Sequence, residues 1–259
     1  MERAKRKNRI LGALLFMLTV FVFCTAMFVS DNDRFPFGRS QEEPEIAEYA
    51  KKNGLSISDY PEELISLYER NEDARQFVLD YPLKKDSDQE IALSMDEYDG
   101  VPLLMQWDER WGYSKYGSGI IGLNGCGPVC LSMVASYLKN DGSLDPKMIA
   151  AFSEENGYYV KGNGTAWALM SEGAEELGLV AKELPLEESI VERELTANHP
   201  IICIMGEGDF TTEGHYIVLT GYHDGMVSVN DPNSYKNSDK LWKFSDIESQ
   251  IKNLWSYEV

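Results

Sequence analysis

Residues 125–138 read GCGPVCLSMVASYL, and this stretch decides how the second half of the chain folds. Apolar side chains recur at positions 130, 133, 134, 137 and 138, which is the spacing of a helical stripe that faces a core. Pro128 suits the first turn of a helix, where no amide partner is lost. The stretch therefore predicts a helix that begins close to Cys126 and packs against the rest of a domain.

The two cysteines of this stretch differ in position. Cys130 belongs to the apolar stripe, so it is predicted to be a buried and inert side chain. Cys126 stands where the helix begins, and there the helix dipole and the free amides lower a thiol pKa and can bind an oxyanion. The flanking glycines, Gly125 and Gly127, allow a ligand to approach the backbone. Cys126 is thus the candidate nucleophile.

A thiolate nucleophile needs a base, and the sequence offers three histidines. His199 lies in a loop before a strand, and His223 lies in a predicted hairpin turn where we expect it to be exposed. His215 opens the β-prone run HYIVLTGY directly after a loop, which is a position that a rigid element holds in place. Beside a poised cysteine, His215 is the candidate base.

A third member of the site depends on the hairpin that follows His215. If His223–Gly225 form a three-residue loop, the two strands pair around residue 224, His215 faces Asn233, and Asp231 is its diagonal neighbour on the same face. Asp231 would then orient the imidazole. A two-residue turn would move Asp231 to the other face and favour Asn233, and Asp-Pro is also an ordinary turn signal.

The remaining pattern predicts an α+β fold, with helices followed by an antiparallel sheet. Two more helices are predicted at 165–177, with Trp167 buried, and at 186–197. A helix with a Ser245–Glu248 capping box is predicted before the last strand. The predicted strands cover 101–107, 200–205, 215–222, 226–230, 241–244 and 254–259.

The segment before residue 100 is organised differently. Residues 45–82 predict short helices, one of them capped by Asn71 and ended by Pro82. They are too few for a core of their own, so they either pack on the following domain or act as a spacer. The predicted linkers are 31–44 and 83–90.

The N-terminus carries a membrane signal. Ile10–Val29 is twenty residues without a charge and follows five basic side chains, which predicts a membrane-spanning helix with a cytoplasmic N-terminus. The predicted organisation is a cytoplasmic segment 1–9, a signal anchor 10–29, a juxtamembrane linker and short helical region 30–99, and a domain 100–259 outside the cytoplasm. Signal cleavage near Ala26, which would release a secreted protein, is the alternative.

Charge and composition exclude some classes of protein. The formal charge is −19, and since residues 1–30 contribute +4, the remainder carries −23. This negative charge argues against nucleic-acid binding, which needs clustered Lys and Arg side chains to neutralise phosphates. Three cysteines follow the apolar segment, an odd number that argues against a disulfide scaffold. Metal-ligand motifs are missing from the sequence, so no metal or other cofactor is predicted.

The order QWDERW, GCGPVCLSMV, GHYIVLTGY and VNDPNS, over about residues 100–259, resembles the bacteriocin-leader (double-glycine) peptidase family, in particular its free-standing extracytoplasmic relatives. The resemblance implies a papain-like cysteine peptidase fold, with the N-terminal helices packed on an antiparallel sheet. It implies Cys126 as nucleophile, His215 as general base and acid, Asp231 as the orienting residue and Gln106 as the oxyanion-hole donor. In members fused to exporters this glutamine lies closer to the cysteine, whereas here residues 107–125 separate the two.

The predicted function is therefore a membrane-anchored thiol hydrolase that cleaves an amide bond. No phosphate-binding G-x-x-x-x-G-K-[ST] motif is present, so the chain is not an exporter that trims its own cargo. The expected partners are a peptide or protein substrate, or cell-wall peptide, and the membrane; nothing in the sequence predicts an oligomeric state. A non-catalytic binding module on the same fold is the alternative.

Overall fold

The computed structural model describes residues 43–87, 91 and 93–259, and within it Pro44–Val259 form one compact unit. In the described part of the chain, no helix has both the length and the apolar character needed to cross a bilayer. The predicted signal anchor at 10–29 lies outside the described residues.

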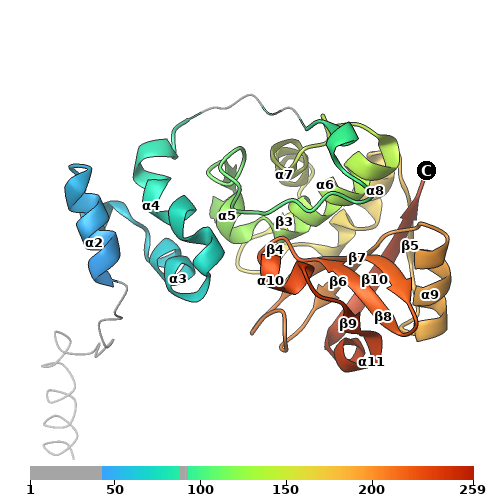
Figure 1. The fold of residues 1–259 in the computed structure, drawn as a ribbon. Helices are drawn as coiled ribbons and strands as arrows, with labels where there is room; N and C mark the ends of the chain where they lie inside the picture. Colours follow the sequence, from blue (N-terminus) through green and yellow to red (C-terminus); the bar gives the residue numbers. More distant parts are fainter. Residues whose placement is uncertain (1–42, 88–90, 92) are drawn as a thin grey trace, which may run out of the picture. The chain divides into compact units, whose positions relative to one another are not determined.

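A six-stranded antiparallel sheet organises the domain (Figure 1). Its strand order is β5-β10-β6-β7-β8-β9, and each neighbouring pair is antiparallel, as the sequence predicts for its second half. The strands are β5 (Val180–Glu183), β6 (Ile201–Met205), β7 (His215–His223), β8 (Met226–Asn230), β9 (Trp242–Lys243) and β10 (Ile251–Glu258).

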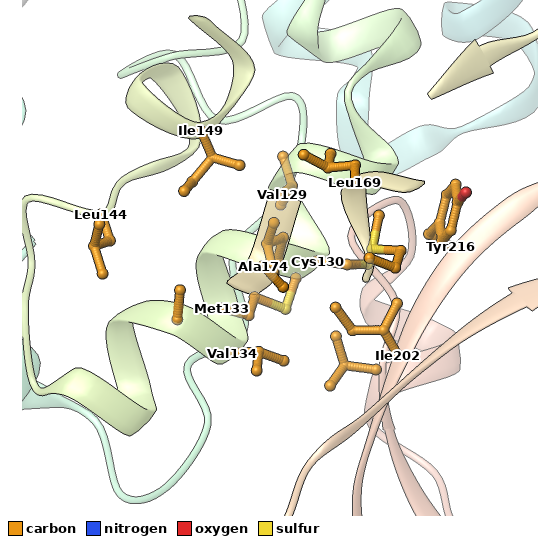
Figure 2. Packing of buried hydrophobic residues seen from close by; sticks show 14 of the residues in the cluster. Val129, Cys130, Met133, Val134, Leu144, Ile149, Leu169, Ala174, Ile202 and Tyr216 are labelled. Atoms are coloured by element: carbon orange, nitrogen blue, oxygen red, sulfur yellow. The ribbon is translucent and has the colours of Figure 1, made fainter. Parts of the chain in front are cut away.

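The two faces of the sheet belong to separate hydrophobic cores, because side chains alternate along each strand. On one face Ile202 and Tyr216 pack against α6 (Cys126–Lys139), which the sequence predicts, and against α7 (Pro146–Glu155). Helix α7 is not among the predicted helices, and its local signals are the cap Asp145 and Pro146 in the first turn. Figure 2 shows four α6 side chains of this core, Val129, Cys130, Met133 and Val134. On the other face Ile217 packs against α9 (Glu188–Thr196) and α11 (Phe244–Ile247).

Three helices precede the domain, namely α2 (Glu43–Lys52), α3 (Glu62–Arg70) and α4 (Arg75–Lys84). Their apolar side chains share one buried cluster with Met105, Trp107 and Tyr113 of the domain, so they pack on it instead of acting as a spacer. Asn71 caps the short 3-10 turn η2 (Glu72–Ala74) as predicted. Pro82 does not end α4 but lies inside it, and Lys85 still donates its N–H to the Tyr81 carbonyl.

The remaining elements are short. They are α5 (Ile121–Asn124), α8 (Glu172–Glu176), α10 (Tyr235–Ser238), the pairs β1 (Lys115–Tyr116) with β2 (Gly119–Ile120) and β3 (Tyr159–Val160) with β4 (Gly164–Thr165), and the 3-10 turns η1 (Ile57–Asp59), η3 (Met95–Glu97), η4 (Trp167–Leu169) and η5 (Glu248–Gln250).

Two predicted elements are wrong in detail. The helix expected at 165–177 is divided into η4 and α8, because Ser171 has non-helical backbone angles, and Trp167 is 48% exposed instead of buried. The Ser245–Glu248 capping box does not form. Instead the N-cap is Lys243, two residues before Ser245, and α11 begins at Phe244, whose N–H donates to the Gly225 carbonyl in the hairpin turn.

The predicted strand at 101–107 is also wrong, although its backbone is held firmly. Its hydrogen bonds go to the end of β8 and to the turn that follows, since the Asn230 side chain donates to the Val101 and Pro102 carbonyls at 3.0 and 3.1 Å. Gln106 donates its N–H to the Pro232 carbonyl at 2.8 Å. These contacts bring Gln106 to the residues around Asp231.

Candidate active site

Cys126 is the first residue of α6, and its position depends on the glycine before it. A Cβ on Gly125 would lie 2.6 Å from the Ile121 carbonyl oxygen, so only glycine permits α5 to run directly into α6. A Cβ on Gly127 would similarly meet the Thr165 side chain at 2.7 Å. Close packing of the chain on itself therefore explains both glycines, in addition to the ligand access that the sequence suggests.

His215 and Asp231 are in direct contact. The His215 Nε2 and the Asp231 Oδ1 are 2.7 Å apart, and both side chains are buried. Two further donors hold the carboxylate, the Asn233 N–H at 2.9 Å on Oδ1 and the Asn237 Nδ2 at 2.8 Å on Oδ2. Asn237 is a site contact that the sequence did not reveal, because the α10 turn alone brings it back to Asp231.

The hairpin reaches this geometry by a different route from the predicted one. His223 pairs with Met226, so the turn has two residues, Asp224 and Gly225, both with positive φ, and the predicted three-residue loop is wrong. A β-bulge between Leu219 and Gly221 inserts one residue into β7 and restores the pairing around residue 224. Asp231 consequently lies on the His215 face, and Asn233 contributes its backbone amide to the aspartate.

The imidazole of His215 also lowers the pKa of the Cys126 thiol. Burial raises the pKa of the Cys126 thiol, but the hydrogen bond and charge of His215 and the N–H groups of Tyr216 and Gly127 outweigh it, so that the pKa is lowered. Burial lowers the pKa of His215, but its hydrogen bonds to Asp231 and Cys126 and their charges raise it overall. Since Nε2 faces Asp231, Nδ1 is the ring nitrogen left for the thiol. The arrangement favours a thiolate–imidazolium pair.

The other two described cysteines lack such partners. Cys130 and Cys203 are fully buried and free, and burial raises the thiol pKa of both. Cys130 lies in the core as predicted (Figure 2). His223 is exposed as predicted, while His199 bonds Glu194 and Glu258 at the far end of the sheet.

Gln106 shares a cavity of about 500 Å³ with Cys126 and His215, which we call the reaction cavity. The side chain of Gln106 is buried, and its Nε2 donates to the Gly122 carbonyl at 3.0 Å. This bond fixes the amide group and uses one of its two hydrogens. The Oε1 atom has no hydrogen-bond partner among the described residues. The structure thus brings together Cys126, His215, Asp231 and Gln106.

Two further cavities adjoin the site. One, of about 550 Å³, is lined by Cys126 and by the aromatic side chains Tyr159, Trp167 and Tyr216, and we call it the aromatic cavity. The other, of about 640 Å³, lies against α3. Glu213 lines all three cavities. Within the described ranges, no group of three or more His, Cys, Asp or Glu side chains is arranged to hold a metal ion.

Comparison with known proteins gives one family match. The model of the Peptidase_C39 like family matches residues 98–258. No curated protein sequence matches the chain.

The solved structures that are similar to the chain include two at low identity. One is the peptidase domain of Streptococcus ComA, a bi-functional ABC transporter involved in a quorum-sensing pathway, at 20% identity over 51% of this chain and 89% of that chain, with a TM-score of 0.40. The other is a double-glycine-motif protease from an AMS/PCAT transporter in complex with the leader peptide, at 18% identity over 65% and 98% of the two chains, with a TM-score of 0.41.

Proposed function

Because the chain belongs to the Peptidase_C39 like family, we propose that it is a cysteine peptidase in which Cys126, His215, Asp231 and Gln106 carry out the reaction. The observation that carries this proposal is the imidazole of His215, which is hydrogen-bonded to Asp231 at 2.7 Å and lines one cavity with the Cys126 thiol at the start of a helix. The proposed substrate is a peptide or protein, in keeping with the family.

In the first half of the proposed reaction, the Cys126 thiolate attacks the carbonyl carbon of the scissile amide. The negative charge passes to the carbonyl oxygen. The second Nε2 hydrogen of Gln106 and the free backbone N–H groups at the N-terminus of α6 stabilise it there. His215 then gives its Nδ1 proton to the departing amine, and the C–N bond breaks. The products are a free amine and an acyl thioester on Cys126.

In the second half, neutral His215 takes a proton from water, and the resulting hydroxide adds to the thioester carbonyl. The C–S bond breaks, a carboxylic acid leaves, and the thiolate–imidazolium pair returns. Asp231 stabilises the imidazolium in both halves and keeps Nδ1 directed at the sulfur. Its three hydrogen bonds leave it little freedom to turn away.

Alkylation of the full-length chain by iodoacetamide tests the proposal. Cys126 reacts with thiolate kinetics below pH 7, whereas Cys130 and Cys203, buried and with raised pKa, stay unlabelled in the folded chain. Site-resolved mass spectrometry measures the three rates. His215→Ala slows Cys126 labelling at pH 6 by tenfold or more, because the variant loses the largest contribution that lowers the thiol pKa, while burial still raises that pKa. Equal labelling with and without His215 contradicts the proposed pair.

A further inference from the structure

The aromatic cavity combines aromatic faces with one carboxylate side chain. Trp167 is 48% exposed, and an edge contact with the buried Trp255 ring, at a centroid distance of 5.9 Å, holds it in place. Tyr159 and Tyr216 line the same cavity. Such faces attract cations through their ring quadrupoles, most strongly in the case of tryptophan.

Glu213 supplies the charge. Of the described residues that line the aromatic cavity, it alone carries a formal charge apart from the reacting Cys126 thiolate. Its backbone is held by the Thr211 hydroxyl, which accepts the Glu213 N–H at 3.1 Å. In the part of the chain that the structure describes, the Glu213 carboxylate has no hydrogen-bond or ion-pair partner. It is therefore available to a ligand.

The cation near the site lies elsewhere. Arg70, at the end of α3, lines the reaction cavity and the cavity against α3 but not the aromatic cavity. The remaining polar side chains of the aromatic cavity, such as Asn124, Asn163 and Thr165, are neutral and offer oxygen atoms as acceptors. Chemically, the cavity is complementary to a positively charged group.

We propose that the aromatic cavity is a substrate subsite that takes a cationic side chain, an ammonium or guanidinium group, of a residue next to the scissile bond. Glu213 is its specificity-determining residue and Trp167 its stacking surface. Cys126 lines the same cavity, so a residue bound there lies beside the nucleophile. This inference rests on the proposed function and adds a substrate class to it, namely peptides with a basic residue at the cleavage site.

Matched electrophilic peptides test the subsite on the full-length chain. Two series of dipeptidyl acyloxymethyl ketones carry lysine, norleucine or glutamate at the first or second position before the ketone, and second-order rates of Cys126 alkylation are measured. In at least one series lysine reacts about five- to thirtyfold faster than norleucine, the combined effect of a carboxylate contact and an aromatic face. Added salt lowers this ratio.

Variants of the loop that carries Glu213 show which side chain produces the preference for lysine. Glu213→Gln brings the lysine-to-norleucine ratio close to one, and Glu213→Lys makes the glutamate peptide the fastest. Glu207→Gln is the matched control, because Glu207 is an exposed carboxylate of the same loop that lines none of the three cavities. A ratio near one in both wild-type series, or a ratio that Glu213→Gln leaves unchanged, overturns the proposal.

Two additional readouts separate this inference from the proposed function. Iodoacetamide carries no side chain that could occupy the aromatic cavity, so its rate of Cys126 alkylation tests the Cys126–His215 pair alone. Calorimetry of the corresponding lysine and norleucine peptide amides on the Cys126→Ala chain tests the subsite without the thiol, and lysine is expected to bind more tightly. Fast iodoacetamide labelling without any lysine preference overturns the subsite only, whereas slow labelling with lysine preference overturns the peptidase proposal only.

Discussion

At the scale of single residues, the site is built from ionisable side chains whose burial is offset by hydrogen bonds. Both His215 and Asp231 are buried, which disfavours their charged forms, yet each is held by hydrogen bonds to the other and to fixed donors. Cys126 gains from this arrangement, because the imidazolium that Asp231 stabilises is the main group that lowers the thiol pKa. The three side chains therefore act as one unit.

Replacing the charge of Asp231 tests this coupling. In Asp231→Asn the imidazolium loses a charge-assisted hydrogen bond, so the pKa of His215 falls toward its ordinary value and that of Cys126 rises. When the solution is acidified, the Cys126 thiolate of the variant therefore becomes protonated at a higher pH than the thiolate of the wild type. We expect iodoacetamide labelling of Cys126 at pH 6 to slow by about tenfold to a hundredfold.

The matched control for this prediction is Asp239→Asn, which removes an exposed carboxylate eight residues further along the chain. The alkylation–pH curve of the control should coincide with the wild-type curve. A curve for Asp231→Asn that also coincides with it would show that the aspartate does not act on the thiol through His215.

At the scale of elements, helix α4 supports the loop that holds Gln106. The Phe77 ring stacks on Tyr113 with centroids 4.3 Å apart, and a Cβ on Gly112 or Gly122 would lie 2.7 or 2.6 Å from it. Gly122 is the residue whose carbonyl accepts the Gln106 Nε2 hydrogen bond. The helices before the family match are thus one packing layer away from the proposed oxyanion hole.

Phe77→Ala is expected to destabilise the whole domain rather than α4 alone. The side chain is buried, so its loss should cost about 3–5 kcal/mol, measured by denaturant unfolding as a shift of a single transition. Leu83→Ala on the same helix is the control, since Leu83 is 54% exposed and its replacement should stay within about 0.5 kcal/mol. An unchanged main transition with a separate early one would mean that the helices form an independent unit.

At the scale of the whole molecule, charge and the N-terminus suggest where the peptidase works. We propose that the chain is held in the cell membrane by Ile10–Val29, with the domain outside the cytoplasm, because five basic residues precede twenty uncharged ones. A body of charge −23 is repelled by anionic lipid surfaces, which would leave the apolar segment as the attachment. These residues lie outside the described part of the chain.

Fractionation of expressing cells tests this proposal. The full-length chain should sediment with membranes, resist extraction by high salt or carbonate, and be released by detergent, since an inserted helix is held by the hydrophobic effect and not by charge. Protease added to intact cells or spheroplasts should remove the domain. Recovery of soluble protein with a new N-terminus near Met27 would instead indicate a cleaved signal.

The sequence by itself determined the features that depend on local spacing. The α6 helix, the starts of β6, β7 and β8 within one residue, the exposure of His223 and the buried state of Cys130 all follow from periodicity and turn chemistry. These signals are local because each is set by which side chains one helix or strand turns toward a core. Cys126 and His215 could be selected for the same reason, each standing at the start of a regular element.

Only the tertiary structure decided how distant segments meet. The contact of Asp231 with His215 depends on a bulge that offsets a shorter turn. Gly221 beside the bulge is a sequence signal for it, but the resulting register follows only from the strand pairing. Gln106 reaches the site because hydrogen bonds from Asn230 and to Pro232 replace strand pairing. Trp167 lies open on a cavity wall because the expected helix is interrupted at Ser171. In each case the outcome is set by long-range contacts, which no local pattern encodes.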